Sequence, residues 1–312
     1  DPVQQRVVRT LAGTQVLGGV GLSAGVSVGA LLAEDVSGSA QFAGLGGTFQ
    51  VLGAALIAIP MSRVMAAHGR RPGLVLGYVL AATGAIGLIT AGVIRNFPLL
   101  LVASVLFGGA TASNSQARYA GADLAHPQHR ARDLSIVVWA TTIGSVVGPN
   151  LVGPSAPFAR ALGLPLLTGP FLFSLLGLLL AIAVLLWRLR PDPLIEARQR
   201  RVADGDDSGA THGSVTRGLR VAAGIPNARL GILTLALGHV VMVSVMVMTP
   251  LHMNHGGADL EVIGFVISIH ILGMFAFSPL TGLAVDRFGG RAVAVLGSAI
   301  LSAAALLASA SP

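Results

Sequence analysis

The stretch that decides the fold is Gly282-Leu283-Ala284-Val285-Asp286-Arg287-Phe288-Gly289-Gly290-Arg291, which lies between two long apolar runs. It contains one acid, two arginines and three glycines. Ionised side chains are costly inside the hydrocarbon core of a bilayer. We therefore expect this stretch to form a tight loop at a membrane surface, joining one membrane-spanning helix to the next.

A weaker copy of this loop occurs over residues 62–71. Gly69, Arg70 and Arg71 fit the pattern, whereas two alanines stand where the acid and the first base belong. Because both copies lie between apolar runs, they indicate an internal repeat. The complete set of acid and bases belongs to the second copy.

The composition is that of a membrane protein. Apolar residues make up 53% of the chain and charged residues 11%, against about a quarter charged in soluble domains. Cysteine is absent, which excludes disulfides, thiolate metal sites and a cysteine nucleophile. No Walker-type phosphate loop occurs, and the His-x-x-His spacing of His252 and His255 is weak evidence for a metal. We predict that the protein is not an enzyme and holds no metal or cofactor.

Charge-free windows long enough to cross a bilayer, which takes about 20 residues, recur along the chain. They predict nine helices, at 10–33, 36–62, 72–94, 96–117, 134–159, 161–187, 230–258, 262–285 and 292–312. If the N-terminus is cytoplasmic, Arg95 and Arg160 are the arginines that fall outside, and the outer loops carry acids instead. This distribution follows the positive-inside rule and explains the net charge of +7 without nucleic acid. We therefore expect a multi-pass protein of the bacterial cytoplasmic (inner) membrane.

One long hydrophilic stretch, residues 188–229, divides six predicted helices from three. We predict an N-terminal six-helix half at 1–190, a cytoplasmic linker at 191–228 with a surface helix near 195–202, and the first three helices of a second half at 229–312. If the second half matches the first, three further helices are expected beyond residue 312.

The loop at 282–291 resembles the signature loop of the major facilitator superfamily: glycine, three residues, acid, base, one residue, glycine, one residue, base. The resemblance implies an all-α membrane protein of major facilitator fold, with two parallel six-helix repeats and nine of twelve helices present. It implies a gating loop at Gly282, Asp286, Arg287, Gly289 and Arg291, repeated at Gly69, Arg70 and Arg71. The alternative is a plain positive-inside loop.

Asp286 can accept hydrogen bonds from the N-terminus of a helix. We expect it near the start of the fifth helix, around Leu134 and Ser135, where it would hold one gating state. In the fifth helix, Gly144, Gly148, Pro149 and Gly153 resemble the superfamily motif associated with antiporters and drug exporters. Glycines four residues apart let a neighbouring helix approach closely, and proline bends a helix by removing a backbone bond. Simple small-residue packing is the alternative to a role in export.

The fourth helix has Ser104 where the superfamily often carries an arginine linked to proton coupling. Polar residues continue along that helix, and we expect Ser104, Thr111, Asn114 and Ser115 to line a cavity or to bond to neighbouring helices. Mid-span carboxylates are absent, so His239 and His270 are the candidates for proton coupling. Each could instead be a neutral histidine that bonds to a neighbouring helix.

Together these features favour secondary active transport, namely proton-coupled export of small, fairly apolar compounds by a monomer. The expected partners are the substrate, protons and the lipid bilayer. Solute uptake by symport is the second interpretation. A non-transporting or truncated membrane protein is the third.

Overall fold

A computed structural model describes residues 2–125, 130–203 and 215–309, and every regular element among them is a helix. The chain divides into two compact units. The first comprises residues 1–204 and 250–276, and the second comprises residues 205–249 and 277–312. The division into two parallel halves at residues 190 and 229 stays a prediction.

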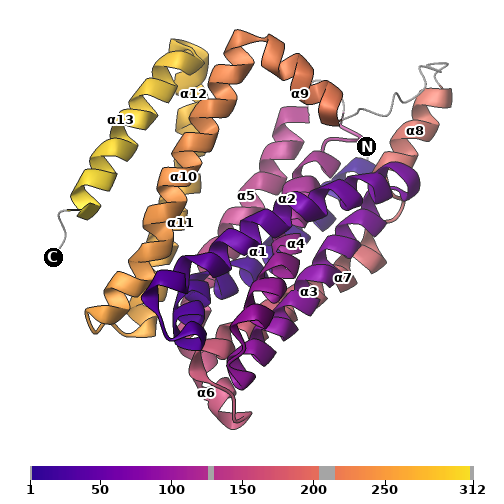
Figure 1. Cartoon of the computed structure of the whole chain (residues 1–312). Coiled ribbons are helices and arrows are strands. Elements are labelled where there is room, and N and C mark those ends of the chain that lie inside the picture. The colour runs from indigo at the N-terminus through magenta and orange to yellow at the C-terminus, as the bar shows by residue number, and fades with distance from the viewer. Residues whose placement is uncertain (1, 126–129, 204–214, 310–312) are drawn as a thin grey trace. The chain divides into compact units, whose positions relative to one another are not determined.

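The first four long helices of the first unit are α1 (Pro2–Ser37), α2 (Ala43–His68), α3 (Arg70–Ile94) and α4 (Phe97–Ala120), with a short 3-10 turn η1 at Ala40–Phe42. Helices α1 to α4 run side by side (Figure 1). Their core contains the fully buried rings of Tyr78, Phe107 and Phe171, and the last two meet edge to face with centroids 5.8 Å apart. Apolar and small residues at the helix contacts therefore hold this bundle together.

The chain continues through α5 (Arg130–Val147), a 3-10 turn η2 (Pro149–Leu151), α6 (Val152–Ala161), a 3-10 turn η3 (Leu166–Thr168), α7 (Gly169–Arg188) and α8 (Pro193–Ala203). Helix α7 packs on α1 and α3. The sixth span was predicted to start at residue 161, but α7 starts at Gly169. The intervening chain contains Gly163 with φ +66° and Pro165, and neither suits a continuing helix. The surface helix predicted near 195–202 is present as α8.

The second part of the chain contains α9 (Val215–Gly224), α10 (Pro226–His255), α11 (Leu260–Ala276), α12 (Ser278–Phe288) and α13 (Gly290–Ser309). The prediction of one helix over 262–285 was wrong, because the chain breaks at Phe277 between α11 and α12. Pro279 lies in the first turn of α12, where its missing N–H costs no hydrogen bond. Eight helical stretches in the described residues are long and apolar enough to cross a membrane, and Leu260–Ala276 is a shorter apolar helix.

Within the second unit, α12 contacts α13. Arg291 Nη2 in the first turn of α13 donates to Asn227 Oδ1 in α10 at 2.6 Å. The described residues of α13 include no buried side chain. This unit is therefore held by fewer contacts than the first.

Candidate functional site

The break after α5 lies tightly against α1. A Cβ on Gly144 would lie 2.9 Å from the backbone nitrogen of Val20, and a Cβ on Gly148 would overlap the hydroxyl of Ser23. Ser23 Oγ also approaches the carbonyl of Gly144 at 3.2 Å. Residues larger than glycine would force α1 and α5 apart, so Gly144 and Gly148 set the spacing of these helices.

Helix α11 also packs against this break. A Cβ on Gly264 would overlap the carbonyl of Pro149. Asn150 Nδ2 donates to Ser268 Oγ at 2.6 Å, and Ser268 Oγ donates to the carbonyl of Val146 at 2.9 Å. That carbonyl belongs to the last turn of α5, where helices leave carbonyls without intrahelical partners. The side chains of Asn150 and Ser268 therefore join α11 to the last turn of α5, which ends just before Pro149.

Gly153 extends this contact onto α6. A Cβ there would lie 2.8 Å from Glu261 Oε1 in the first turn of α11. The predicted glycines at 144, 148 and 153 thus all lie in close helix contacts, while their role in export stays a prediction. Asn150, Gly264 and Ser268 were missed. An asparagine directly after Gly-Pro was the available signal, because its side-chain amide can donate to a carbonyl of the last helical turn, as Asn150 Nδ2 does to Val146 at 2.8 Å.

The first loop copy turns sharply at Gly69, whose φ is +96°. The backbone N–H groups of Arg70 and Arg71 donate to Asp192 Oδ1 and Oδ2 at 3.0 and 2.7 Å. A carboxylate in this position satisfies free N–H groups and suits the positive end of the helix dipole. Asp192 lies just before α8, so the segment after α7 caps α3.

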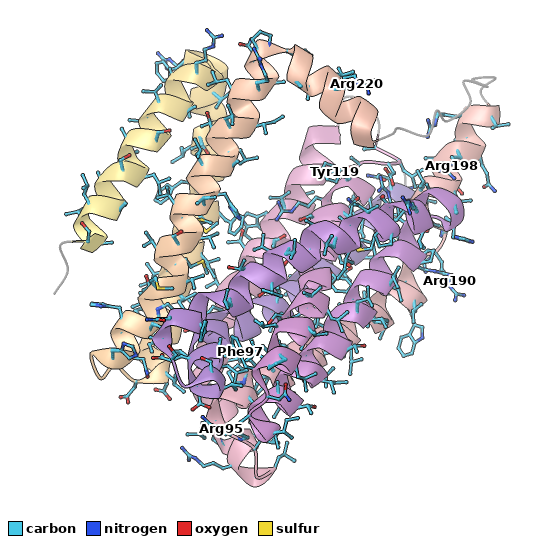
Figure 2. The ribbon with its side chains drawn as sticks, in the orientation of Figure 1. Arg95, Phe97, Tyr119, Arg190, Arg198 and Arg220 are labelled. Carbon is cyan, nitrogen blue, oxygen red and sulfur yellow. The ribbon has the colours of Figure 1, made fainter. Side chains whose placement is uncertain are left out.

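The side chain of Arg70 makes a two-pronged contact with Asp123 beyond α4, with Nε–Oδ2 at 2.7 Å and Nη2–Oδ1 at 3.0 Å. Both side chains are largely buried, at 17% and 13% exposed. Arg198 Nη1 of α8 donates to the carbonyl of Ala66 at 2.9 Å. Asp123 and Asp192 thus supply the acids that this loop copy lacks. Figure 2 shows Arg190 and Arg198 at the end of the bundle opposite Arg95.

The second loop copy has the same local form. Gly289 has φ +82° and donates its N–H to the carbonyl of Val285 at 2.9 Å, as Gly69 does to Met65 at 2.9 Å. Arg287 lies 5.7 Å from the ring centre of Phe288. The placement of Gly282, and the side chains of Asp286, Leu134 and Ser135, lie outside the described residues. The contact predicted between Asp286 and the fifth helix therefore stays a prediction.

The polar residues of α4 face different surroundings. Ser104 is buried and bonds to the carbonyl of Leu100 in its own helix at 2.8 Å, whereas Thr111 is half-buried and Ser115 is exposed. Asn114 is buried and accepts a hydrogen bond of 2.6 Å from the hydroxyl of Tyr78.

Gln15 Nε2 of α1 donates to the backbone carbonyl of Asn114 at 2.7 Å. Gln15 Oε1 and Asn114 Nδ2 are buried without a partner among the described residues. The sequence pattern indicated Asn114 but missed Tyr78 and Gln15, which lie on two other helices. The cavity-lining role of the α4 residues stays a prediction.

The two histidines proposed for proton coupling lie in different units. His239 belongs to the second unit and His270 to the first. Both are exposed, and neither makes a hydrogen bond or ion pair with another described residue. Their role in proton coupling stays a prediction. In the part of the chain that the structure describes, no cluster of three His, Asp or Glu side chains could hold a metal ion.

A second polar contact lies at the opposite end of the first unit from Arg70. His255 Nε2, at the end of α10, is 2.8 Å from Glu34 Oε1 in the last turn of α1. Arg95 Nη1 lies 3.4 Å from Asp35 Oδ2. A pocket of about 270 Å³ opens beside these pairs, lined by Leu31, Glu34, Asp35, Leu167, Asn254 and His255.

Comparisons with known proteins agree with this architecture. The family model for the Major Facilitator Superfamily matches residues 11–312. The uncharacterized MFS-type transporter YdeG of Bacillus subtilis (strain 168) is 40% identical over 308 residues, which cover 99% of this chain and 71% of the relative. The riboflavin transporter RfnT of Brucella anthropi is 29% identical over 313 residues, covering 97% of this chain and 72% of that protein.

Among solved structures, a D-xylose-proton symporter superposes with a TM-score of 0.62 at 17% identity, covering 91% of this chain and 69% of the symporter. At this identity the likeness concerns the fold alone. The all-helical membrane architecture predicted from the loop at 282–291 is confirmed.

Proposed function

Because the chain belongs to the Major Facilitator Superfamily, a family of membrane transporters and not of enzymes, we propose that it exports small, fairly apolar compounds in exchange for protons. Transport across a membrane follows from the family. The direction, the coupling ion and the substrate class are the proposal. So are the bacterial inner membrane with a cytoplasmic N-terminus and the monomeric state.

The contact between α11 and the broken fifth span carries the proposal. Transporters of this architecture move two groups of helices against each other around a central site. Here Gly148 and Pro149 end α5, and Gly264 lets α11 approach the break closely. The polar bonds at this contact are few, with Asn150 and Ser268 supplying both side chains. Such a contact can close one side of the protein and separate without breaking a large buried network.

The proposed substrate class, small and fairly apolar compounds, is supported by the lack of charged residues within the predicted spans. Charged residues make up 11% of the chain and gather near helix ends. Ionisable groups inside spans mark the pathways of ions and charged substrates, and the charge-free windows offer no carboxylate for one. The spans consist mainly of apolar and small residues, which suit a compound recognised mainly by apolar contact.

Riboflavin transport is a second candidate, favoured by the 29% identity to a protein named as a riboflavin transporter. Uptake by symport remains the alternative direction, because neither histidine candidate distinguishes it from antiport. A non-transporting membrane protein is the third alternative.

The test uses inside-out membrane vesicles that contain the protein. The interior of these vesicles is made acidic, so that a proton gradient points outward. A lipophilic fluorescent dye and riboflavin, which is itself fluorescent, serve as two probes. We expect the acid interior to drive accumulation of the dye in exchange for protons, and an ionophore that collapses the pH gradient to abolish it. Proton-driven riboflavin accumulation confined to right-side-out vesicles would reverse the proposed direction and substrate. Transport of neither probe, with the protein folded, would favour the third alternative.

A further inference from the structure

We propose that the face of α4 that bears Thr111, Ser115 and Arg118 binds the carboxylate of a small, mainly apolar compound. This inference rests on the proposed export of such compounds and narrows the substrate to those that carry one carboxylate. Arg118 is the residue that recognises the charge.

Arg118 is a partly buried cation without a counter-ion in the described part of the chain. It lies in the last turn of α4, and its Nε is buried without a hydrogen-bond partner. Arg70 shows the usual arrangement, because Asp123 neutralises it with two hydrogen bonds. Asp133, at the start of α5, accepts from Gln4 Nε2 at 2.7 Å instead. Because a buried cation is costly unless it is paired, Arg118 has a place for an anion that no described acid fills.

Two amide side chains beside Arg118 also have buried atoms that no described residue satisfies. Asn114 lies one helical turn before Arg118, and Gln15 Nε2 of α1 donates to its backbone carbonyl at 2.7 Å. Asn114 Nδ2 and Gln15 Oε1 are buried and have no partner among the residues that the structure describes. Most buried polar atoms in native proteins have a partner. The concentration of such atoms around one turn of α4 therefore points to a ligand rather than to ordinary packing.

Thr111 and Ser115 add hydroxyl groups to the face that bears Arg118. Their spacing of four and three residues places all three side chains on one side of the helix. Ser104 bonds to the carbonyl of Leu100 in its own helix, whereas the hydroxyls of Thr111 and Ser115 bond to no described residue. Ser115 is exposed, and Thr111 is half-buried. Since polar side chains on membrane helices face protein or water rather than lipid, these two hydroxyls are available to a ligand.

The hydrogen-bonding groups of this face match a carboxylate. A guanidinium group donates two parallel hydrogen bonds to the two oxygens of a carboxylate, and the nearby hydroxyls can donate to either oxygen. A cationic ligand is excluded, because it would meet the charge of Arg118 without a free carboxylate beside it. Arg118 is half-buried although its Nε is buried, so the outer end of the guanidinium reaches solvent. The ligand therefore engages that end.

The experiment measures ligand binding to the full chain in an uncharged detergent by isothermal titration calorimetry. Phenylbutyrate is the probe, and phenylbutanol, which has the same apolar body without the charge, is the matched ligand control. We expect phenylbutyrate to bind more tightly than phenylbutanol. Arg118→Gln should weaken phenylbutyrate binding about ten- to hundredfold, the equivalent of a hydrogen bond to a charged group, and should leave phenylbutanol binding unchanged.

Three further variants separate recognition of the carboxylate from a general effect of charge or folding. Arg118→Lys keeps the charge but not the two parallel bonds, and should cause a smaller loss than Arg118→Gln. Ser115→Ala, at an exposed position, should weaken phenylbutyrate binding about two- to tenfold. Arg63→Gln is the matched control, because it removes the same charge from an exposed arginine of α2. Circular dichroism checks folding, and Ser115→Ala decides the question if Arg118→Gln is not folded.

Equal weakening by Arg118→Gln and Arg63→Gln, or phenylbutyrate binding no tighter than phenylbutanol binding, overturns the proposal. A lipid phosphate has similar chemistry, so a second titration adds phosphatidylglycerol. Loss of phenylbutyrate binding there would assign the site to a lipid headgroup and would also overturn the proposal. The binding assay needs no proton gradient. Intact binding with failed dye transport therefore contradicts the proposed export alone, whereas absent binding with intact dye transport contradicts the carboxylate site alone.

Discussion

Asn150 and Ser268 are separated by 118 residues in sequence, yet Asn150 Nδ2 donates a hydrogen bond of 2.6 Å to Ser268 Oγ. The bond lies where Pro149 ends the regular part of the fifth span, and Ser268 also donates to the carbonyl of Val146. One serine on α11 thus bonds both to the side chain beyond the break and to a backbone carbonyl before it. The pair ties α11 to the structural irregularity of the fifth span.

We predict that Asn150→Ala and Ser268→Ala are coupled. Interhelical hydrogen bonds in membrane proteins contribute about 0.6 kcal/mol on average and about 1.7 kcal/mol at most. A double-mutant cycle, with unfolding measured in mixed detergent, should give a coupling energy in this range. Ser298→Ala is the control, because Ser298 bonds to its own helix on α13. Strictly additive effects of the two substitutions would show that the bond contributes nothing.

Gly264→Ala is expected to destabilise the protein by about 1–3 kcal/mol, the usual cost of overpacking. The new methyl group would overlap the carbonyl of Pro149. Gly273→Ala on the same helix meets nothing within 4 Å and should be neutral or slightly stabilising. Thermal unfolding of the two variants side by side measures the difference. Equal melting temperatures would contradict the close approach of α11 to the break.

Arg70→Lys should destabilise the first unit by about 1.5–3 kcal/mol, the range for hydrogen bonds to charged groups. Lysine cannot reproduce the two parallel bonds that the guanidinium makes to Asp123. The exposed Arg63 serves as the matched control, and Arg63→Lys should change stability little. Chemical unfolding followed by tryptophan fluorescence provides the measurement. A loss of equal size in both variants would argue against a specific role of the Arg70–Asp123 pair.

Asp192→Asn should weaken the cap on α3 by about 0.3–1 kcal/mol, the usual range for a charge at a helix end. The carboxylate accepts from the N–H groups of both Arg70 and Arg71, and asparagine offers a single acceptor oxygen without charge. Hydrogen exchange of the first turn of α3 should speed up selectively. Asp259→Asn, at the other end of the unit, should leave that exchange unchanged.

Asp286→Asn tests the gating role expected of the second loop copy. We expect the substitution to slow transport and to shift the balance between the two accessibility states. Labelling of single cysteines from either side of the membrane reports on that balance. Unchanged transport and unchanged accessibility would exclude a gating role for this acid.

The two loop turns were predictable because each depends on one local property. Gly69 and Gly289 adopt positive φ, which glycine does at little cost. Pro149 likewise indicated that the fifth span is interrupted. Its missing N–H removes a backbone hydrogen bond within one helical turn. The break at Phe277 was missed although Pro279 stands in the sequence. Apolar windows measure side-chain hydropathy and do not register a lost backbone donor.

The partners of the polar residues were not predictable in the same way. Asp123 and Asp192 lie 53 and 122 residues from Arg70, and nothing in their immediate sequence distinguishes them from ordinary surface acids. In the sequence, His255 was noticed only for its spacing from His252, and nothing there paired it with Glu34. Helix packing selects which distant side chains meet, and a hydropathy pattern contains no information on rotation or register between helices.

By itself, the sequence determined that this is an all-helical membrane protein of the Major Facilitator Superfamily and where most of its spans lie. These properties follow from the cost of placing charges in lipid and from backbone geometry, which act over a few residues. The tertiary structure alone decided that Asn150 meets Ser268, that Asp123 and Asp192 complete the first loop, and that Glu34 meets His255. Those contacts depend on how closely the helices approach, and that is set by the combined packing of small residues on several helices at once.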